Sequence, residues 1–228
     1  NGDVFFQHRE ACNPAYENVP AVVEEYMNKI SEITGRKYGL FNYYGAPDAD
    51  RVIIAMGSVT QAAQEAIDAM MEKGEKVGLV SVHLYRPFSA KHFLAAVPAT
   101  AKRIAVLDRT KEPGANGEPL FLDVKECFYG KENAPIIVGG RYGLASKDTT
   151  PAQIIGVFEN LALPMPKDHF TVGIVDDVTF TSLPLPEEVA LGDKSTYEAK
   201  FYGLGADGTV GANKNSIKII GDNTSKYC

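Results

Sequence analysis

The stretch Arg51-Val-Ile-Ile-Ala-Met-Gly-Ser58, together with the helical pattern that follows it to Gly74, decides the fold of this chain. Residues 51–56 are almost continuously apolar and rich in β-branched side chains, which is typical of a strand buried on both faces of a parallel sheet. Gly57 turns the chain, and Ser58 is placed to cap a helix whose apolar residues recur at spacings of three and four. The sequence therefore predicts a strand, a tight turn and a helix.

The same unit recurs along residues 36–181. Short β-branched runs alternate with helical patterns, and turn residues separate them. Such alternation predicts an α/β fold, a three-layer parallel sheet with helices on both faces and right-handed crossovers. Further strands are expected at 76–85, 103–107, 136–138 and 170–175, and further helices at 89–94, 120–128 and 151–161.

The two ends of the chain differ from this core. Residues 1–35 contain a strand-like run at 4–6 and then a helix that begins at Asn13-Pro14 and stops at Gly35. Residues 40–44 are expected to form a short strand. Residues 182–196, rich in proline and charge, indicate a linker. Residues 198–204 are expected to open a strand, turn and helix over 197–228, which is too short to close a second domain.

Composition excludes several classes of protein. The chain has 228 residues and a formal net charge of −6 with no basic block, which argues against a general nucleic-acid binder. We expect no membrane association, because the chain has neither a bilayer-spanning apolar run nor a signal peptide. Cys12, Cys127 and Cys228 are far apart, so no iron–sulfur or zinc site is expected from this chain alone. An odd number of scattered cysteines fits a reducing, cytoplasmic compartment.

The run Gly203-Leu-Gly-Ala-Asp-Gly208 has the spacing Gly-x-Gly-x-x-Gly and precedes a helical pattern over 209–220. Glycines allow backbone N–H groups to approach an anion, and a helix N-terminus adds partial positive charge. A phosphate-bearing ligand is therefore one interpretation. The other is that the glycines only form a tight turn.

Other polar residues are expected to have structural roles. Arg86 could grip a carboxylate, but an inter-domain ion pair is favoured. Gly139-Gly140-Arg141 could cradle an anion, but a tight turn is favoured. The pairs Asp108-Arg109 and Lys111-Glu112 are expected in a solvated loop. No metal or hydrolase role is expected for the dispersed histidines or for two candidate serines: His8, His83, His92, His169, Ser58 and Ser146.

Several long motifs resemble one family. Residues 201–224 resemble a signature of pyruvate:ferredoxin (flavodoxin) oxidoreductases, at the start of their γ-type, coenzyme A-binding domain. Residues 48–59, 83–88 and 139–151 resemble the transketolase C-terminal-like domain of that family, and residues 3–11 resemble the exit from its first domain. The resemblance implies an internal fragment: 1–35 exit and linking helix, 36–181 transketolase C-terminal-like domain, 182–196 linker, 197–228 start of the γ-type domain.

The resemblance also implies a function for the parent enzyme. It would oxidise pyruvate with coenzyme A to acetyl-coenzyme A and carbon dioxide, using thiamine diphosphate, magnesium and three 4Fe–4S clusters, and would reduce ferredoxin or flavodoxin. The parent is expected to be a homodimer. The thiamine, magnesium and cluster ligands would lie in other domains, so this chain alone is expected to be inactive and to hold no catalytic residue. Its part of the coenzyme A site would be Gly205, Ala206, Asp207, Gly208 and Thr209.

Two alternatives to this function remain. One is a non-enzymatic interaction domain that docks a partner through strand-end loops such as residues 139–147. The other is a free-standing nucleotide-binding protein that uses the glycine turn, although the chain is too short to close the domain that this would need.

Overall fold

A computed structural model describes residues 1–176, 178–184, 186 and 197–228. The chain divides into two compact units, residues 1–191 and residues 192–228. Each is considered by itself. Most of the linker predicted at 182–196 lies outside the described residues.

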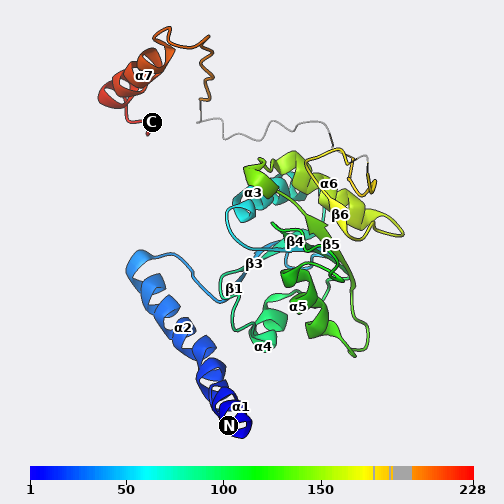
Figure 1. The fold of residues 1–228 in the computed structure, drawn as a ribbon. Coiled ribbons are helices and arrows are strands. Elements are labelled where there is room, and N and C mark those ends of the chain that lie inside the picture. Colours follow the sequence, from blue (N-terminus) through cyan, green and yellow to red (C-terminus); the bar gives the residue numbers. More distant parts are fainter. Residues whose placement is uncertain (177, 185, 187–196) are drawn as a thin grey trace. The chain divides into compact units, whose positions relative to one another are not determined.

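The larger unit contains a six-stranded sheet in the order β1-β3-β2-β4-β5-β6 (Figure 1). Each neighbouring pair from β3 to β6 is parallel, as the sequence predicts. The strands are β1 (Phe41–Gly45), β2 (Arg51–Ala55), β3 (Val77–Val82), β4 (Arg103–Asp108), β5 (Ile136–Arg141) and β6 (Phe170–Thr171).

The edge strand β1 departs from the predicted parallel arrangement. It pairs with β3 in the antiparallel direction, with Phe41 opposite Val82 and Gly45 opposite Gly78. The cause is the length of the connection from β1 to β2. Residues 46–50 are far too few for a crossover, which takes about a dozen residues, so the two strands must run in opposite directions.

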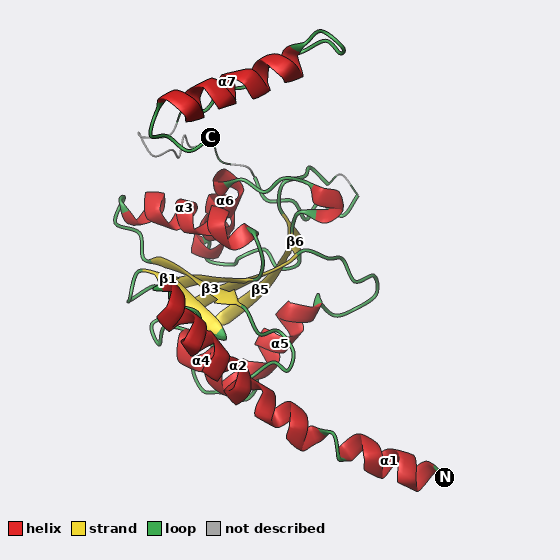
Figure 2. Ribbon diagram, turned by 90° about the vertical axis from the view of Figure 1, so that its left-hand side faces the viewer, coloured by secondary structure: helices red, strands yellow, loops and turns green. Residues whose placement is uncertain are grey.

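Helices cover both faces of the sheet (Figure 2). The helices α3 (Val59–Met71) and α6 (Pro151–Ala162) share one core with Ile53 of β2. The helices α4 (Ala90–Ala96) and α5 (Pro119–Phe128) cover the opposite core, to which Val52 and Ile54 point. Because side chains alternate along a strand, β2 is buried on both faces, as expected. The three-layer α/β fold is confirmed.

The N-terminal run at 4–6 is helical, so the strand-like interpretation was wrong. It lies in α1 (Gly2–Glu10), whose N-cap Asn1 accepts a hydrogen bond from the amide of Asp3. A strand needs a neighbour for its backbone groups, whereas a helix satisfies them internally. The next helix, α2 (Asn13–Thr34), ends at Gly35 with φ 70°, and Val23 and Met27 pack it against the core that α4 and α5 cover.

Two strand predictions fail in part or entirely. The strand expected at 170–175 is reduced to the two residues of β6, after which the chain turns at Gly173 with φ 88°. The strand expected at 198–204 is absent among the described residues of the smaller unit, because that unit offers no second strand to pair with. Its helix, α7 (Thr209–Asn223), is present as predicted and buries no side chain.

The termini of the helices show one further difference. Ser58 is the N-cap residue of α3, but its side chain makes no capping hydrogen bond because its backbone is already helical, with φ −64°. None of the helices in the described part of the chain is both long and apolar enough to cross a bilayer.

Candidate functional site

The five residues predicted for coenzyme A lie in one turn that leads into α7. Gly205 has φ 131° and Gly208 has φ 86°, values that residues with a side chain rarely adopt. A Cβ atom at Gly203 would lie 2.8 Å from the hydroxyl oxygen of Thr209. Each of the three glycines of the motif is therefore required by the backbone or by a close contact.

The carboxylate of Asp207 organises this turn from within. It accepts hydrogen bonds from the amide of Leu204 (2.7 Å) and from both the amide (3.0 Å) and the hydroxyl (2.6 Å) of Thr209. These donors favour the ionised form and lower the pKa of Asp207 to about 2, the Thr209 hydroxyl contributing most. The turn thus already contains one anion.

Other N–H groups remain for a ligand. In the part of the chain that the structure describes, the amides of Gly208, Val210 and Gly211 donate to no protein acceptor. They lie at or in the first turn of α7, where the helix dipole favours negative charge. The turn can therefore contact an anion through these three amides, although the charge of Asp207 opposes close approach.

We expect the turn to lose its internal cap only in strong acid. A carboxyl whose pKa is depressed in the folded state contributes stability above its unfolded pKa of about 3.9, and this contribution is lost as the pH falls through the folded pKa. For Asp207 that window is about pH 4 to 2. The amide proton of Thr209, followed by NMR, should titrate with a midpoint near pH 2. The Asp207→Asn variant should show no such titration, and a midpoint near 4 in the unmodified chain would contradict the capping role.

The second candidate region is the carboxyl edge of the sheet, between β2 and β4. The chain leaves β2 toward β3 on one side, and β4 lies on the other side, so the strand order reverses here. Ligands of open α/β sheets bind at such switch points. A pocket of about 380 Å³ lies at this position, and Ser58, Asp108, Arg109 and Tyr142 are among its lining residues.

Asp108 in this pocket is buried, so the expectation of a solvated loop was wrong for this residue. Its two carboxylate oxygens accept the amide protons of Leu120 (3.0 Å) and Phe121 (3.1 Å) at the start of α5. Burial raises its pKa, and the two amides oppose that shift. Asp108 therefore fixes α5 to the end of β4. Arg109 is exposed, as expected, and donates to the carbonyl of Gly143.

The run Gly139-Gly140-Arg141 belongs to β5, so neither a tight turn nor an anion cradle describes it. A Cβ atom at Gly140 would lie 2.2 Å from the ring of Phe170, and one at Gly139 would lie 3.0 Å from Phe121. The two glycines make room for aromatic rings. Arg141 is largely buried and faces Glu118 at 3.5 Å, while it donates to the carbonyl of His169 at 2.8 Å.

Arg86 forms an ion pair within its own domain. Its guanidinium donates to Asp123 of α5 at 2.7 Å and lies over the ring of Tyr85 at 3.9 Å. The inter-domain pair favoured by the sequence is not what the structure shows. Proximity in space explains the difference, since Tyr85 and Phe88 on either side of Arg86 pack against the core that α5 covers.

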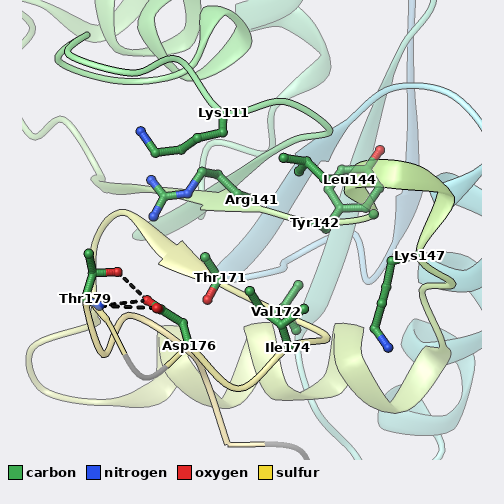
Figure 3. A pocket seen from close by; sticks show the side chains of 11 residues that line it. Lys111, Arg141, Tyr142, Leu144, Lys147, Thr171, Val172, Ile174, Asp176 and Thr179 are labelled. Atoms are coloured by element: carbon green, nitrogen blue, oxygen red, sulfur yellow. Dashed lines mark hydrogen bonds between the residues drawn. The ribbon is translucent and has the colours of Figure 1, made fainter.

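A second pocket adjoins the end of β5 and has a volume of about 300 Å³ (Figure 3). Its apolar lining comes from Tyr142, Leu144, Val172 and Ile174. Cationic side chains surround it: Lys111, Arg141 and Lys147. Nothing in the sequence marks it as one feature, because its residues come from three separate stretches: the loop of Lys111, the end of β5 with the loop after it, and β6 with the loop after it.

Metal chemistry finds no support in the described residues. No group of three or more histidine, cysteine or acidic side chains lies close enough there to hold an ion. The three cysteines are free, and burial raises the pKa of Cys127 to about 11. The histidines have local roles: for example, His83 lies 2.8 Å from the carbonyl of Gly39, and His92 lies 2.6 Å from Ser89.

Comparison with known proteins decides the family. Residues 49–154 match the model described as pyruvate:ferredoxin oxidoreductase core domain II. The whole chain is 59% identical to a pyruvate-flavodoxin oxidoreductase of Enterobacter agglomerans, covering 19% of that protein. It is 60% identical to the pyruvate-flavodoxin oxidoreductase of Klebsiella pneumoniae, covering 20% of that protein. It is 56% identical to the pyruvate:ferredoxin oxidoreductase of Moorella thermoacetica, covering 19% of that protein. The chain belongs to the pyruvate:ferredoxin oxidoreductase family.

The chain spans about a fifth of the length of these curated relatives. The segment that matches core domain II runs from just before β2 into α6 and includes the switch-point pocket. The glycine turn lies outside that segment. In this chain, the sheet edge and the glycine turn are therefore separate candidate sites.

Proposed function

We propose that this chain is part of a longer enzyme that oxidatively decarboxylates pyruvate with coenzyme A and passes the electrons to ferredoxin or flavodoxin. The observation that supports this most is the 59% identity, over the full 228 residues, to a protein named pyruvate-flavodoxin oxidoreductase. The products would be acetyl-coenzyme A and carbon dioxide. The named relatives are all oxidoreductases, which gives no support to a non-enzymatic interaction domain.

The described residues do not fit the redox cofactors that this function requires. They contain no cluster of ligands for magnesium or iron, and their cysteines are free. Thiamine diphosphate, magnesium and the 4Fe–4S clusters are therefore assigned to other parts of the full-length enzyme, which we place in the cytoplasm as a homodimer. No catalytic step is assigned to residues of this chain.

The contribution of this chain would be structural and substrate-binding. Residues 36–181 would form an α/β domain that packs against the cofactor-binding domains. Residues 197–228 would open the coenzyme A domain, in which Gly205, Ala206, Asp207, Gly208 and Thr209 line the phosphate groups. The glycine conformations and the three available amides support this assignment. The carboxylate of Asp207 would face donor groups of the protein, and the amides would face the ligand.

An activity assay on the chain tests this division of roles. The 228-residue chain, supplied with pyruvate, coenzyme A, thiamine diphosphate and magnesium, should reduce no methyl viologen. The full-length enzyme, loaded with its clusters, should reduce the dye in a reaction that needs both pyruvate and coenzyme A. Reduction by the chain alone would show that the catalytic groups had been assigned to the wrong part. Dye reduction by the full-length enzyme that does not depend on pyruvate would refute the proposed substrate.

A further inference from the structure

The loop that follows β6 is held in one shape by polar contacts. The carboxylate of Asp176 accepts the amide protons of Val178 (2.9 Å) and Thr179 (3.2 Å), and it also bonds the hydroxyls of Thr179 and Thr181. Figure 3 shows Asp176 turned toward Thr179. Lys167 donates to the carbonyls of Phe180 (3.2 Å) and Ser182 (3.0 Å). These bonds pin the described residues of the loop, 172–176 and 178–183.

This pinned loop exposes large apolar side chains. Val175 is 90% exposed, Val178 81% and Phe180 73%, and Ile174 is partly exposed beside them. Single exposed apolar residues are ordinary, but several on one preformed loop mark a surface that contacts another molecule. A loop that is already ordered also loses little entropy when it binds.

The loop borders the pocket of about 300 Å³ whose walls are Tyr142, Leu144, Val172 and Ile174. Figure 3 shows Lys111 beside Arg141 at one end of this pocket and Lys147 at the other. Arg141 faces Glu118, whereas Asp176 keeps its negative charge, because the donors that it bonds in its own loop are neutral. In the described part of the chain, neither Lys111 nor Lys147 has an ion-pair partner. The pocket therefore combines an apolar floor with a lining of net positive charge, in which Lys111 and Lys147 form no ion pair with the described residues.

We propose that this pocket and the loop after β6 together bind a segment of the rest of the full-length polypeptide, with a large apolar side chain in the pocket and aspartate or glutamate facing Lys111 and Lys147. The inference shares one premise with the proposed function, that the protein extends beyond this chain. The relatives are about five times as long, so most of such a protein lies outside the structure. The segment is expected to be acidic because its carboxylates would complement the positive charges of Lys111 and Lys147.

A polypeptide accounts for the surface better than a small molecule does. A ligand that fills about 300 Å³ is at the lower end of the usual range of binding pockets and would leave Val175, Val178 and Phe180 in water. A segment that runs across the pocket and the loop would cover both. Its anchor side chain would lie in the pocket, and the surrounding loop would exclude water around it.

Photo-crosslinking in the full-length protein tests the proposal. Phe180 is replaced by p-benzoylphenylalanine, the protein is irradiated, and the crosslinked peptides are identified by mass spectrometry. The expected result is an intramolecular crosslink to one segment outside residues 1–228 that carries aspartate or glutamate next to a large apolar residue. The Lys111→Glu, Lys147→Glu double variant should lower the yield of this crosslink by about fivefold or more, because two attractions become repulsions.

Matched controls separate this surface from general effects. Lys73→Glu also reverses an exposed lysine, but it follows α3 at the opposite edge of the sheet and should leave the crosslink yield unchanged. Replacement of Tyr129, which is 84% exposed at the end of α5, by the same photo-reactive residue should not give the same crosslink.

Three results would overturn the proposal: no crosslink from position 180, crosslinks only to other molecules, or a crosslinked segment without acidic residues. Hydrogen exchange gives an independent measurement. The amides of residues 174–176 and 178–180 should exchange at least about tenfold more slowly in the full-length protein than in the 228-residue chain, and equal rates would refute burial of the loop. Neither measurement depends on catalysis, so they can fail while the proposed activity holds.

Discussion

The Asp108→Ala variant is expected to lower the free energy of unfolding of the larger unit by about 3 kcal/mol. The side chain accepts two amide protons of α5 in a buried position, from Leu120 and Phe121. Alanine would leave both donors without a partner, and each buried donor left unsatisfied costs about 1–3 kcal/mol. Release of the burial penalty on the carboxylate, whose pKa is raised, offsets part of that cost.

Urea denaturation followed by circular dichroism would measure this loss as a lower midpoint with an unchanged slope. Asp123→Ala is the matched control, because Asp123 lies on the same helix and makes a partly exposed ion pair with Arg86. Such a pair contributes about 1 kcal/mol or less. Asp108→Asn should fall between the two, since one acceptor oxygen remains. An Asp108→Ala variant as stable as the unmodified chain would contradict the anchoring role.

The sequence predicts the α/β fold well because the deciding signal is local. The apolar run of β2 and the helical period of α3 each require a buried neighbour, and repetition of that unit leaves few arrangements. The antiparallel direction of β1 follows from the short connection at 46–50, whereas the place of β1 beside β3 depends on how the strands are ordered in space. The strand order β1-β3-β2 shows that residues 46–50 pass the end of β3, which lies between β1 and β2. The pattern of hydrophobic residues carries no information about that order.

The candidate sites also differ in how far the local sequence could predict them. The glycine turn is local, so its position and the following helix could be predicted, and Gly205 and Gly208 have the positive φ that such a turn needs. The role of Asp207 as an internal acceptor was missed, because a carboxylate in a turn has the same sequence signature whether it faces the protein or a ligand.

The sheet-edge features were missed for a different reason. Asp108 has a charged neighbour and precedes a polar loop, which is the pattern of a solvated residue. Its burial follows from α5 folding back onto the end of β4, where the helix amides need an acceptor. Likewise, Gly140 is explained only by Phe170, which is thirty positions away in the chain. Contacts between distant segments decide both cases.

The Gly208→Val variant of the full-length enzyme is expected to raise KM for coenzyme A by at least about tenfold. Gly208 is the N-cap residue of α7 with φ 86°, where a β-branched residue is strained. Among the described residues other than its two chain neighbours, no heavy atom would lie within 4 Å of an added Cβ, so the variant should fold. The backbone of the turn would relax toward negative φ, and the amides of Val210 and Gly211 would turn away from the ligand. This expectation rests on the proposed coenzyme A site.

The pattern of the kinetic constants identifies the cause. If the turn only binds coenzyme A, kcat at saturating coenzyme A should remain nearly unchanged while KM rises, because binding is lost equally from the ground state and the transition state. Gly221→Ala is the control: this glycine lies near the end of α7 with open space around it, and alanine favours the helix by up to about 1 kcal/mol. An unchanged KM in Gly208→Val would remove the turn from the coenzyme A site. A fall in kcat alone would instead place the turn in a step after binding, such as closure of the domain that it opens.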